Sequence, residues 1–246
     1  MKKLVVIEGL DGSGKATQAA LLSASLAEKG VTVRQVSFPD YTSNSSALVK
    51  MYLAGEFGDK PGDVNAYAAS SFYAVDRYAS FKKDWEEAWR SGVIVADRYT
   101  TSNAIHQCSK LPEEQWDAFL EWLFHFEYDL LGIPAPNAVI YLRVDPEVSQ
   151  KLLAKRYEGH MEKEDIHEKD RAYLARCQKA ADHCAAKLGW KVVECCEKGQ
   201  MRTIEAIGRE IVETVDACME GEKSWKGKNH GTDQSDKVSD RWLIYH

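Results

Sequence analysis

The chain has 246 residues, of which 44% are hydrophobic and 28% charged, and its formal net charge is −6. This length suits one α/β domain with a full core, and a second domain is not required. The acidic balance argues against a nucleic-acid partner, because a surface that coats nucleic acid would be basic. The sequence has no apolar run long enough to span a bilayer, and its first apolar stretch is too short for a signal peptide, so we expect a cytoplasmic protein without a membrane partner.

Apolar runs alternate with helical patterns along the whole chain. The predicted strands are 3–8, 31–38, 92–97, 137–144 and 190–195, and the predicted helices are 15–29, 46–57, 64–90, 113–128, 146–157, 170–188 and 201–219. Strands that alternate with helices predict a parallel sheet covered on both faces. We therefore expect a three-layer α/β/α fold with a five-stranded parallel sheet.

Two polar segments differ from this pattern. Residues 158–169 (EGHMEKEDIHEK) are charged and include a glycine, which predicts a loop that acts as a lid. From residue 221 to 246 the composition becomes polar and poor in helix formers, which predicts a C-terminal tail. The expected organisation is therefore one domain over 1–220 followed by that tail.

The stretch EGLDGSGKATQ, residues 8–18, follows the first predicted strand and opens the first predicted helix. Gly9, Gly14 and Lys15 match the phosphate-binding pattern G-x-x-x-x-G-K, in which backbone N–H groups and the helix N-terminus face phosphate oxygens. Lys15 adds a full charge that can follow a transferred phosphoryl group, so it is a candidate catalytic residue. The predicted nucleotide-binding residues are Gly9, Leu10, Asp11, Gly12, Ser13, Gly14, Lys15, Ala16 and Thr17.

The phosphate loop departs from the pattern at Ala16, where a hydroxyl residue normally holds Mg²⁺. Mg²⁺ keeps several waters and uses few protein ligands, so the loss of one hydroxyl need not abolish binding. Asp97 ends a neighbouring predicted strand, and we expect it to take the larger share of the metal through water. A protein that binds nucleotide without turnover is the competing interpretation.

Four segments in sequence order, EGLDGSGKATQ, SFPDYTSNSS, SSFYAVDRYASF and ADRYTTSNAIHQ, resemble the thymidylate kinase family. The resemblance covers roughly residues 3–215. It implies a P-loop kinase that transfers the γ-phosphoryl group of ATP to dTMP, giving dTDP and ADP, with Mg²⁺ as cofactor. It also implies a homodimer with helices packed across the two-fold axis. The aromatic helices 64–90 and 113–128 carry enough apolar surface for this, and the alternative is that the same residues form the core.

The resemblance assigns roles on the acceptor side of the site. Arg98, in the family's D-R-[YH] motif, would grip the acceptor phosphate. Tyr73 would stack on thymine and Arg77, four residues later, would bond to a base carbonyl, although the family usually has phenylalanine at the position of Tyr73. Without the resemblance, Tyr73 as a core residue and Arg77 as a surface charge would be the simpler interpretation.

Further polar and aromatic positions are assigned by the same resemblance. Asp11 would face the sugar or the metal, Ser102 and Asn103 would lie near the base, and His106 would lie beside the sugar. The remaining predicted contact is Phe38, which precedes Pro39. At His106 the family usually has Tyr or Phe, and a histidine satisfied within the fold stays an open alternative. Tyr41 stands where the family often has an arginine, so one phosphate contact is missing.

The source of a catalytic arginine is the last open position. Some thymidylate kinases supply it from the phosphate loop directly after the aspartate, where this chain has Gly12. Others supply it from the lid, and here Arg156 is the first candidate and Arg171 the second. A solvated charged loop is the alternative for this segment.

Two other functions stay open at this level. A kinase for another nucleoside monophosphate would keep the fold and change the acceptor. A regulatory protein that binds nucleotide without turnover would keep the loop and lose the transfer machinery. A GTPase is disfavoured, because the sequence lacks the N-K-x-D motif that reads guanine.

Overall fold

The structure is a computed structural model that describes residues 2–156 and 171–226. The predicted lid at 158–169 and most of the predicted tail at 221–246 lie outside the described residues. Helix α9 (Ile204–Lys226) continues past the expected boundary at 220.

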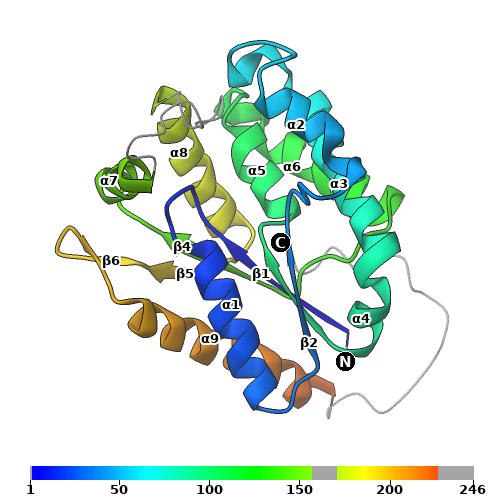
Figure 1. The fold of residues 1–246 in the computed structure, drawn as a ribbon, viewed down its shortest axis with the longest axis vertical. Helices are drawn as coiled ribbons and strands as arrows, with labels where there is room; N and C mark the ends of the chain where they lie inside the picture. The colour runs from blue at the N-terminus through cyan, green and yellow to red at the C-terminus, as the bar shows by residue number, and fades with distance from the viewer. Residues whose placement is uncertain (1, 157–170, 227–246) are drawn as a thin grey trace.

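A five-stranded sheet forms the centre of the domain, in the order β2-β3-β1-β4-β5 (Figure 1). The strands are β1 (Lys3–Glu8), β2 (Val33–Ser37), β3 (Val93–Asp97), β4 (Ala138–Arg143) and β5 (Lys191–Glu194), and each neighbouring pair is parallel. The prediction of a five-stranded parallel sheet is therefore confirmed. Because the strands are parallel, their carboxyl ends share one edge, where ligands bind in such sheets.

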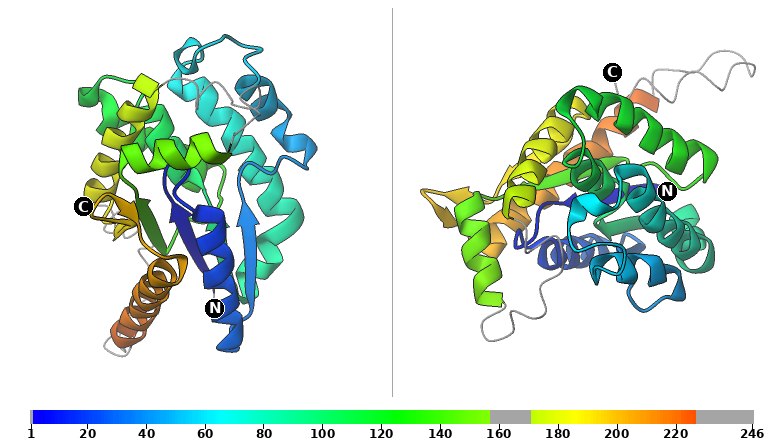
Figure 2. Two further views of the ribbon diagram at one scale, coloured as in Figure 1. Left: turned by 60° about the vertical axis from the view of Figure 1, so that its left-hand side comes forward. Right: turned by 90° about the horizontal axis from the view of Figure 1, so that it is seen from above.

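The residues of β1 alternate between two cores, as the two-residue period of a strand requires. Val5 and Ile7 pack with one hydrophobic cluster, to which α1 (Lys15–Glu28) and α9 contribute. Leu4 and Val6 pack with the other cluster. Every residue of β1 is buried, which explains its continuous apolar run. Figure 2 shows α1 lying along β1 and β2.

Helices on the second face carry most of the acceptor-side candidates. They are α3 (Ala66–Ser80), α4 (Glu86–Ser91), α5 (Thr100–Cys108), α6 (Trp116–Phe124) and α8 (Arg171–Lys187). The shorter α2 (Ala47–Leu53) precedes α3, and α7 (Pro146–Arg156) follows β4. The helices cover both faces of the sheet, so the three-layer arrangement is confirmed.

Two of the long predicted helices contain π-helical turns. Between α3 and α4 the segment Phe81–Trp85 is π-helical, and His125–Leu130 after α6 is π-helical as well. Such turns insert an extra residue and often occur at functional sites. The second one contains Glu127, whose side chain is completely buried.

One helix and two short strands of the structure are absent from the predicted set. Helix α5 begins with four polar residues, Thr100 to Asn103, so it carries little apolar signal. The short antiparallel strands β6 (Cys196–Glu197) and β7 (Gln200–Met201) are too short for a periodic pattern. Lys198 and Gly199 join them in the left-handed conformation that suits a tight hairpin.

Candidate active site

The phosphate loop joins the end of β1 to the start of α1. Gly12 and Gly14 have φ angles of 80° and 85°, which favour glycine. A Cβ atom at Gly9 would lie 2.6 Å from Ser13 Oγ and 3.0 Å from the carbonyl oxygen of Leu142. The loop therefore adopts a compact turn that other side chains would disturb.

Lys15 is the first residue of α1 and folds back over this loop. Its ammonium donates a hydrogen bond to the carbonyl oxygen of Leu10 at 2.9 Å and lies 4.0 Å from Asp11 Oδ1. Burial of the side chain, followed by repulsion from Arg98, lowers the pKa of Lys15 to about 8. A phosphate bound at this point would supply a negative charge and relieve that repulsion.

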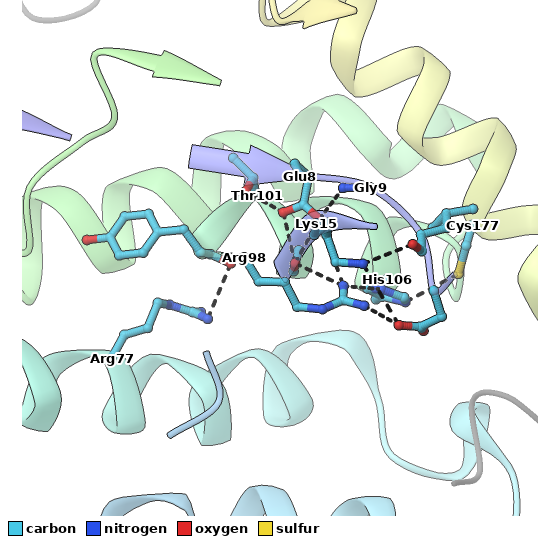
Figure 3. A network of polar contacts seen from close by, with 12 residues as sticks. Glu8, Gly9, Lys15, Arg77, Arg98, Thr101, His106 and Cys177 are labelled. Carbon is cyan, nitrogen blue, oxygen red and sulfur yellow. Dashed lines mark hydrogen bonds and ion pairs between the residues drawn. The ribbon is translucent and has the colours of Figure 1, made fainter. Parts of the chain in front are cut away.

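Arg98 follows the last residue of β3 and has a φ angle of 64°, in the left-handed region that a non-glycine residue rarely occupies. Its guanidinium donates to Asp11 Oδ1, and its Nη1 lies 3.4 Å from both Ser102 Oγ and His106 Nε2. Arg98 and Lys15 extend toward the same point beside the loop (Figure 3).

Acidic groups surround Arg98. Burial alone would lower the pKa of Arg98, but the carboxylates of Asp11, Glu8 and Asp97 raise it by more. Arg98 therefore carries a permanent charge at the edge of the sheet where a ligand would enter.

Glu8 is a further carboxylate at this edge, and it is completely buried. It accepts hydrogen bonds from Thr101 Oγ1 at 2.6 Å, from Ser102 Oγ at 2.8 Å and from the Gly9 backbone N–H at 2.9 Å. This carboxylate thus ties β1, the phosphate loop and α5 together (Figure 3). Glu8 is not among the predicted site residues, although an acid directly before a phosphate loop is visible in the sequence.

Asp97 lies where a metal-bound water could meet it. Its side chain is 9% exposed, and its Oδ1 has no hydrogen-bond partner among the described residues. An orphaned carboxylate oxygen beside the phosphate loop fits a water-mediated Mg²⁺ contact. Within residues 2–156 and 171–226 no group of three or more acidic, histidine or cysteine side chains could hold a metal by itself. The metal-binding role of Asp97 stays a prediction.

Arg77 lies to one side of the Arg98 group (Figure 3). Its side chain is 2% exposed and pairs with Glu127, so it is not a surface charge. Its Nη1 lies 3.5 Å from the Tyr99 carbonyl oxygen. Tyr73 is half-buried on the same helix, with its ring centroid 6.4 Å from that of Tyr52. Their proposed contacts with a base stay predictions.

The α5 side chains reach different parts of the site. Ser102 contacts Glu8 and Arg98, whereas Asn103 donates to the carbonyl oxygen of Ser70 at 3.1 Å. His106 is 7% exposed, and its Nδ1 lies 3.2 Å from the hydroxyl of Tyr173.

Two further predicted site residues are Phe38 and Arg156. The ring of Phe38 packs in the core, 5.7 Å from the ring of Tyr99 and 6.3 Å from that of Trp85. Arg156 is the last residue of α7, and its side chain lies outside the described part of the structure.

Gln107 is a buried polar residue of α5 that the sequence did not predict. It is completely buried, and both polar atoms of its side chain have no partner in the described part of the chain.

A cavity of about 180 Å³ lies beside the phosphate loop. Leu10, Asp11 and Ser13 line it from the loop, and Ser149 and Gln178 line it from α7 and α8. Ser149 Oγ also donates to the backbone carbonyl of Asp11 at 2.7 Å. The loop thus borders a hollow that α7 and α8 also line.

A family model described as thymidylate kinase matches residues 7–202, most of the chain. The chain belongs to the thymidylate kinase family. The thymidylate kinase of Mycobacterium tuberculosis (strain ATCC 25618 / H37Rv) is 30% identical over 193 residues, which cover 76% of this chain and 87% of that protein. That of Caenorhabditis elegans is 29% identical over 155 residues, covering 59% of this chain and 65% of that protein.

A solved structure of thymidylate kinase from Candida albicans has the same fold. It matches with a TM-score of 0.63 and 20% identity, over 87% of this chain and 91% of that one. As a thymidylate kinase family member, this chain combines the P-loop fold with a methyl group at Ala16. Its site brings Lys15, Arg98 and Asp11 together at the edge of the sheet. Two cations beside a loop of backbone N–H groups can hold two phosphate groups near each other.

Proposed function

We propose that this protein transfers the γ-phosphoryl group of ATP to dTMP, giving dTDP and ADP. A phosphate oxygen of dTMP attacks the γ-phosphorus, and the bond from that phosphorus to the β–γ bridging oxygen breaks. No general base is required, because the attacking oxygen is already anionic at neutral pH. The observation that carries the proposal is the convergence of Lys15 and Arg98 beside the phosphate loop in a chain of this family.

On the donor side, residues 9–17 hold the phosphates of ATP. Backbone N–H groups of the loop and the N-terminus of α1 face the phosphate oxygens, and Lys15 neutralises charge that builds up during transfer. Asp97 would hold Mg²⁺ through water, and the metal would supply further charge neutralisation. The support for this role of Asp97 is its buried Oδ1, which has no hydrogen-bond partner in the described part of the chain.

On the acceptor side, Arg98 binds the phosphate of dTMP with the two-pronged geometry that arginine offers to oxyanions. The ring of Tyr73 stacks on the base, while Arg77 and Asn103 read its polar edge. Ser102 lies near the base, and His106 lies toward the sugar. Catalysis is then mostly positioning and charge stabilisation.

We further propose that Arg156 supplies positive charge during transfer. Replacement of Arg156 by alanine should lower turnover with little change in ATP affinity. An unchanged turnover rate would remove Arg156 from the mechanism.

We propose that the protein forms a homodimer through the aromatic face of α3 and α6. Tyr67, Val75 and Tyr78 on α3 are each more than 40% exposed. Such exposed apolar surface is typical of an interaction site. Light scattering on the purified protein tests this, and a monomeric mass at micromolar concentration would contradict it.

The described residues include no helix long and apolar enough to cross a membrane. The six cysteines are all free. Because free thiols persist in reducing compartments, we propose that the enzyme acts in the cytoplasm. Cell fractionation with a tagged full chain tests this location.

Release of ADP from Mg²⁺-ATP in the presence of dTMP, dUMP, dCMP, dGMP, UMP or AMP tests the reaction. Rapid turnover with dTMP is the expected result. Preference for another monophosphate would keep the transfer mechanism but overturn the roles given to Tyr73, Arg77 and Asn103. ATP binding without turnover on any acceptor would refute the proposal.

A further inference from the structure

The carboxylate of Glu127 joins two side chains that are assigned to the acceptor base. Glu127 is completely buried in the π-helical segment that follows α6. Its Oε2 accepts from Arg77 Nε at 2.7 Å, and its Oε1 accepts from Arg77 Nη2 at 2.5 Å. Its Oε1 also accepts from Asn103 Nδ2 at 3.3 Å. One carboxylate therefore orients both side chains.

The two-pronged pairing fixes which edge of Arg77 remains for a ligand. Nε and Nη2 both face Glu127, so Nη1 points away from the carboxylate. Nη1 carries two N–H bonds, of which one is directed to the carbonyl oxygen of Tyr99 at 3.5 Å. The second N–H of Nη1 has no acceptor among the described residues and is left as a donor for a ligand.

The same carboxylate fixes the orientation of the Asn103 amide. Nδ2 has two N–H bonds, and it donates to the carbonyl oxygen of Ser70 at 3.1 Å as well as to Glu127. Both donors are therefore used within the fold. The amide oxygen, Oδ1, accepts no hydrogen bond in the part of the chain that the structure describes, so it is left as an acceptor.

A third donor holds the carboxylate itself in place. Thr100 Oγ1 donates to Glu127 Oε2 at 2.8 Å. Thr100 is completely buried at the start of α5, one turn before Asn103. The carboxylate is therefore anchored on α5 as well as on α3, and it cannot turn without breaking these bonds.

We propose that Glu127 is a positioning residue that makes the acceptor pocket select thymine or uracil over cytosine. Thymine and uracil carry a carbonyl oxygen next to a ring N–H, which matches a donor from Arg77 and an acceptor from Asn103. Cytosine carries an amino group next to an unprotonated ring nitrogen, so it sets donor against donor and acceptor against acceptor. This inference rests on the proposed function, because it requires that the base lies between α3 and α5.

Two substitutions of Glu127 test the inference in different ways. Glu127→Gln replaces one carboxylate oxygen by an NH₂ group, which cannot accept from Arg77 and can donate to Asn103 so that its amide turns over. Glu127→Asp keeps the charge and shortens the reach by one methylene group. Because Glu127→Asp leaves no uncompensated buried charge on Arg77, it carries the test if Glu127→Gln fails to fold.

The measurements are KM for dTMP, KM for ATP, and the ratio of kcat/KM for dTMP to that for dCMP. We expect KM for dTMP to rise and the ratio to fall, each by at least about tenfold, because buried polar groups lose their partners. KM for ATP should change by less than about twofold, since uniform damage would affect both substrates. Calorimetric titration with dTMP and dCMP in the absence of ATP gives the same comparison without catalysis.

Asp84→Asn is a matched control for the loss of a carboxylate from an arginine pair. Asp84 pairs with Arg34 at 2.5 Å, and both side chains are exposed. This variant should keep the wild-type KM values and the wild-type base preference. If the KM values or the base preference of Asp84→Asn changed as much as those of Glu127→Asp, these measurements would not report on the acceptor pocket.

The inference is overturned if folded Glu127→Asp retains the wild-type KM for dTMP and the wild-type base preference. It is also overturned if kcat falls and both KM values rise together while the base preference is unchanged. The same holds if neither Glu127 variant folds, because Glu127 would then have a structural role alone. Failure of the proposed function is visible separately, since wild-type protein would then neither bind nor phosphorylate dTMP.

Discussion

The burial of Lys15 predicts that its removal stabilises the protein while it abolishes the reaction. Burial and repulsion from Arg98 lower the pKa of Lys15 from 10.5 to about 8. At 1.36 kcal/mol per pH unit, keeping this charge in the folded protein at pH 7 costs about 3 kcal/mol. Lys15→Met also removes the hydrogen bond to Leu10, worth about 1 kcal/mol. The net gain in the free energy of unfolding is therefore about 2 kcal/mol.

Thermal unfolding at pH 7 without nucleotide measures this gain. A stabilisation of about 2 kcal/mol should raise the Tm of Lys15→Met by roughly 4–8 °C in a chain of this size. The turnover rate should fall by roughly 10²–10³-fold, because the cation proposed to act on the transferred phosphoryl group is lost. An exposed lysine, Lys179, provides the control, and Lys179→Met should change neither quantity.

The pH dependence of this difference separates charge burial from improved packing. Between about pH 8 and pH 10.5 the unfolded chain keeps the proton on Lys15 while the folded protein releases it. The unfolded state then binds more protons, so wild-type stability rises with pH relative to Lys15→Met. The difference in Tm between Lys15→Met and the wild type should be constant below pH 8 and should decrease toward pH 10. A Tm of Lys15→Met at or below the wild-type value at pH 7 would refute the reasoning, and so would a gap that does not change with pH.

Three further variants test the other parts of the site. Arg98→Lys removes the proposed two-pronged contact with the acceptor phosphate, so kcat/KM for dTMP should fall by about 10–100-fold with little change in KM for ATP. Equal losses for both substrates would contradict this role. Asp97→Asn should raise the Mg²⁺ concentration for half-maximal rate by roughly 10–100-fold, and unchanged Mg²⁺ dependence would show that Asp97 does not hold the metal. Gly9→Ala brings a methyl group within 3.0 Å of the Leu142 carbonyl oxygen. ATP affinity, measured by titration, should therefore fall by about tenfold or more, whereas wild-type affinity would mean that the loop can move without cost.

The local sequence determined the frame of the domain and the position of the phosphate loop. The central strands β1 and β3 are short, fully buried runs rich in apolar residues, because both faces of the sheet are covered by helices. The glycines and Lys15 of the loop occupy fixed spacings along the chain, so a pattern in neighbouring residues was sufficient to find them. The same holds for Arg98 and Asp97, which directly follow or end a strand.

The partners of the buried charges were decided only by the tertiary structure. Arg77 and Glu127 are 50 positions apart, and Glu8 meets Thr101 across 93 positions. No periodic pattern connects residues at such separations, because only the packing of separate helices and strands in the folded chain brings them together. The π-helical segment that carries Glu127 is also invisible in the apolar pattern, since it adds one residue to a turn without changing composition.

The sequence by itself therefore determined which side chains could bind phosphate, and the tertiary structure decided how the neighbouring acids hold them. A glycine loop between a strand and a helix has a conformation that depends mainly on its own residues. The charge and the direction of Lys15, Arg98 and Arg77 depend instead on burial and on carboxylates from distant segments. Electrostatic interactions in a buried site act through space, so their strength is set by the folded arrangement of the chain.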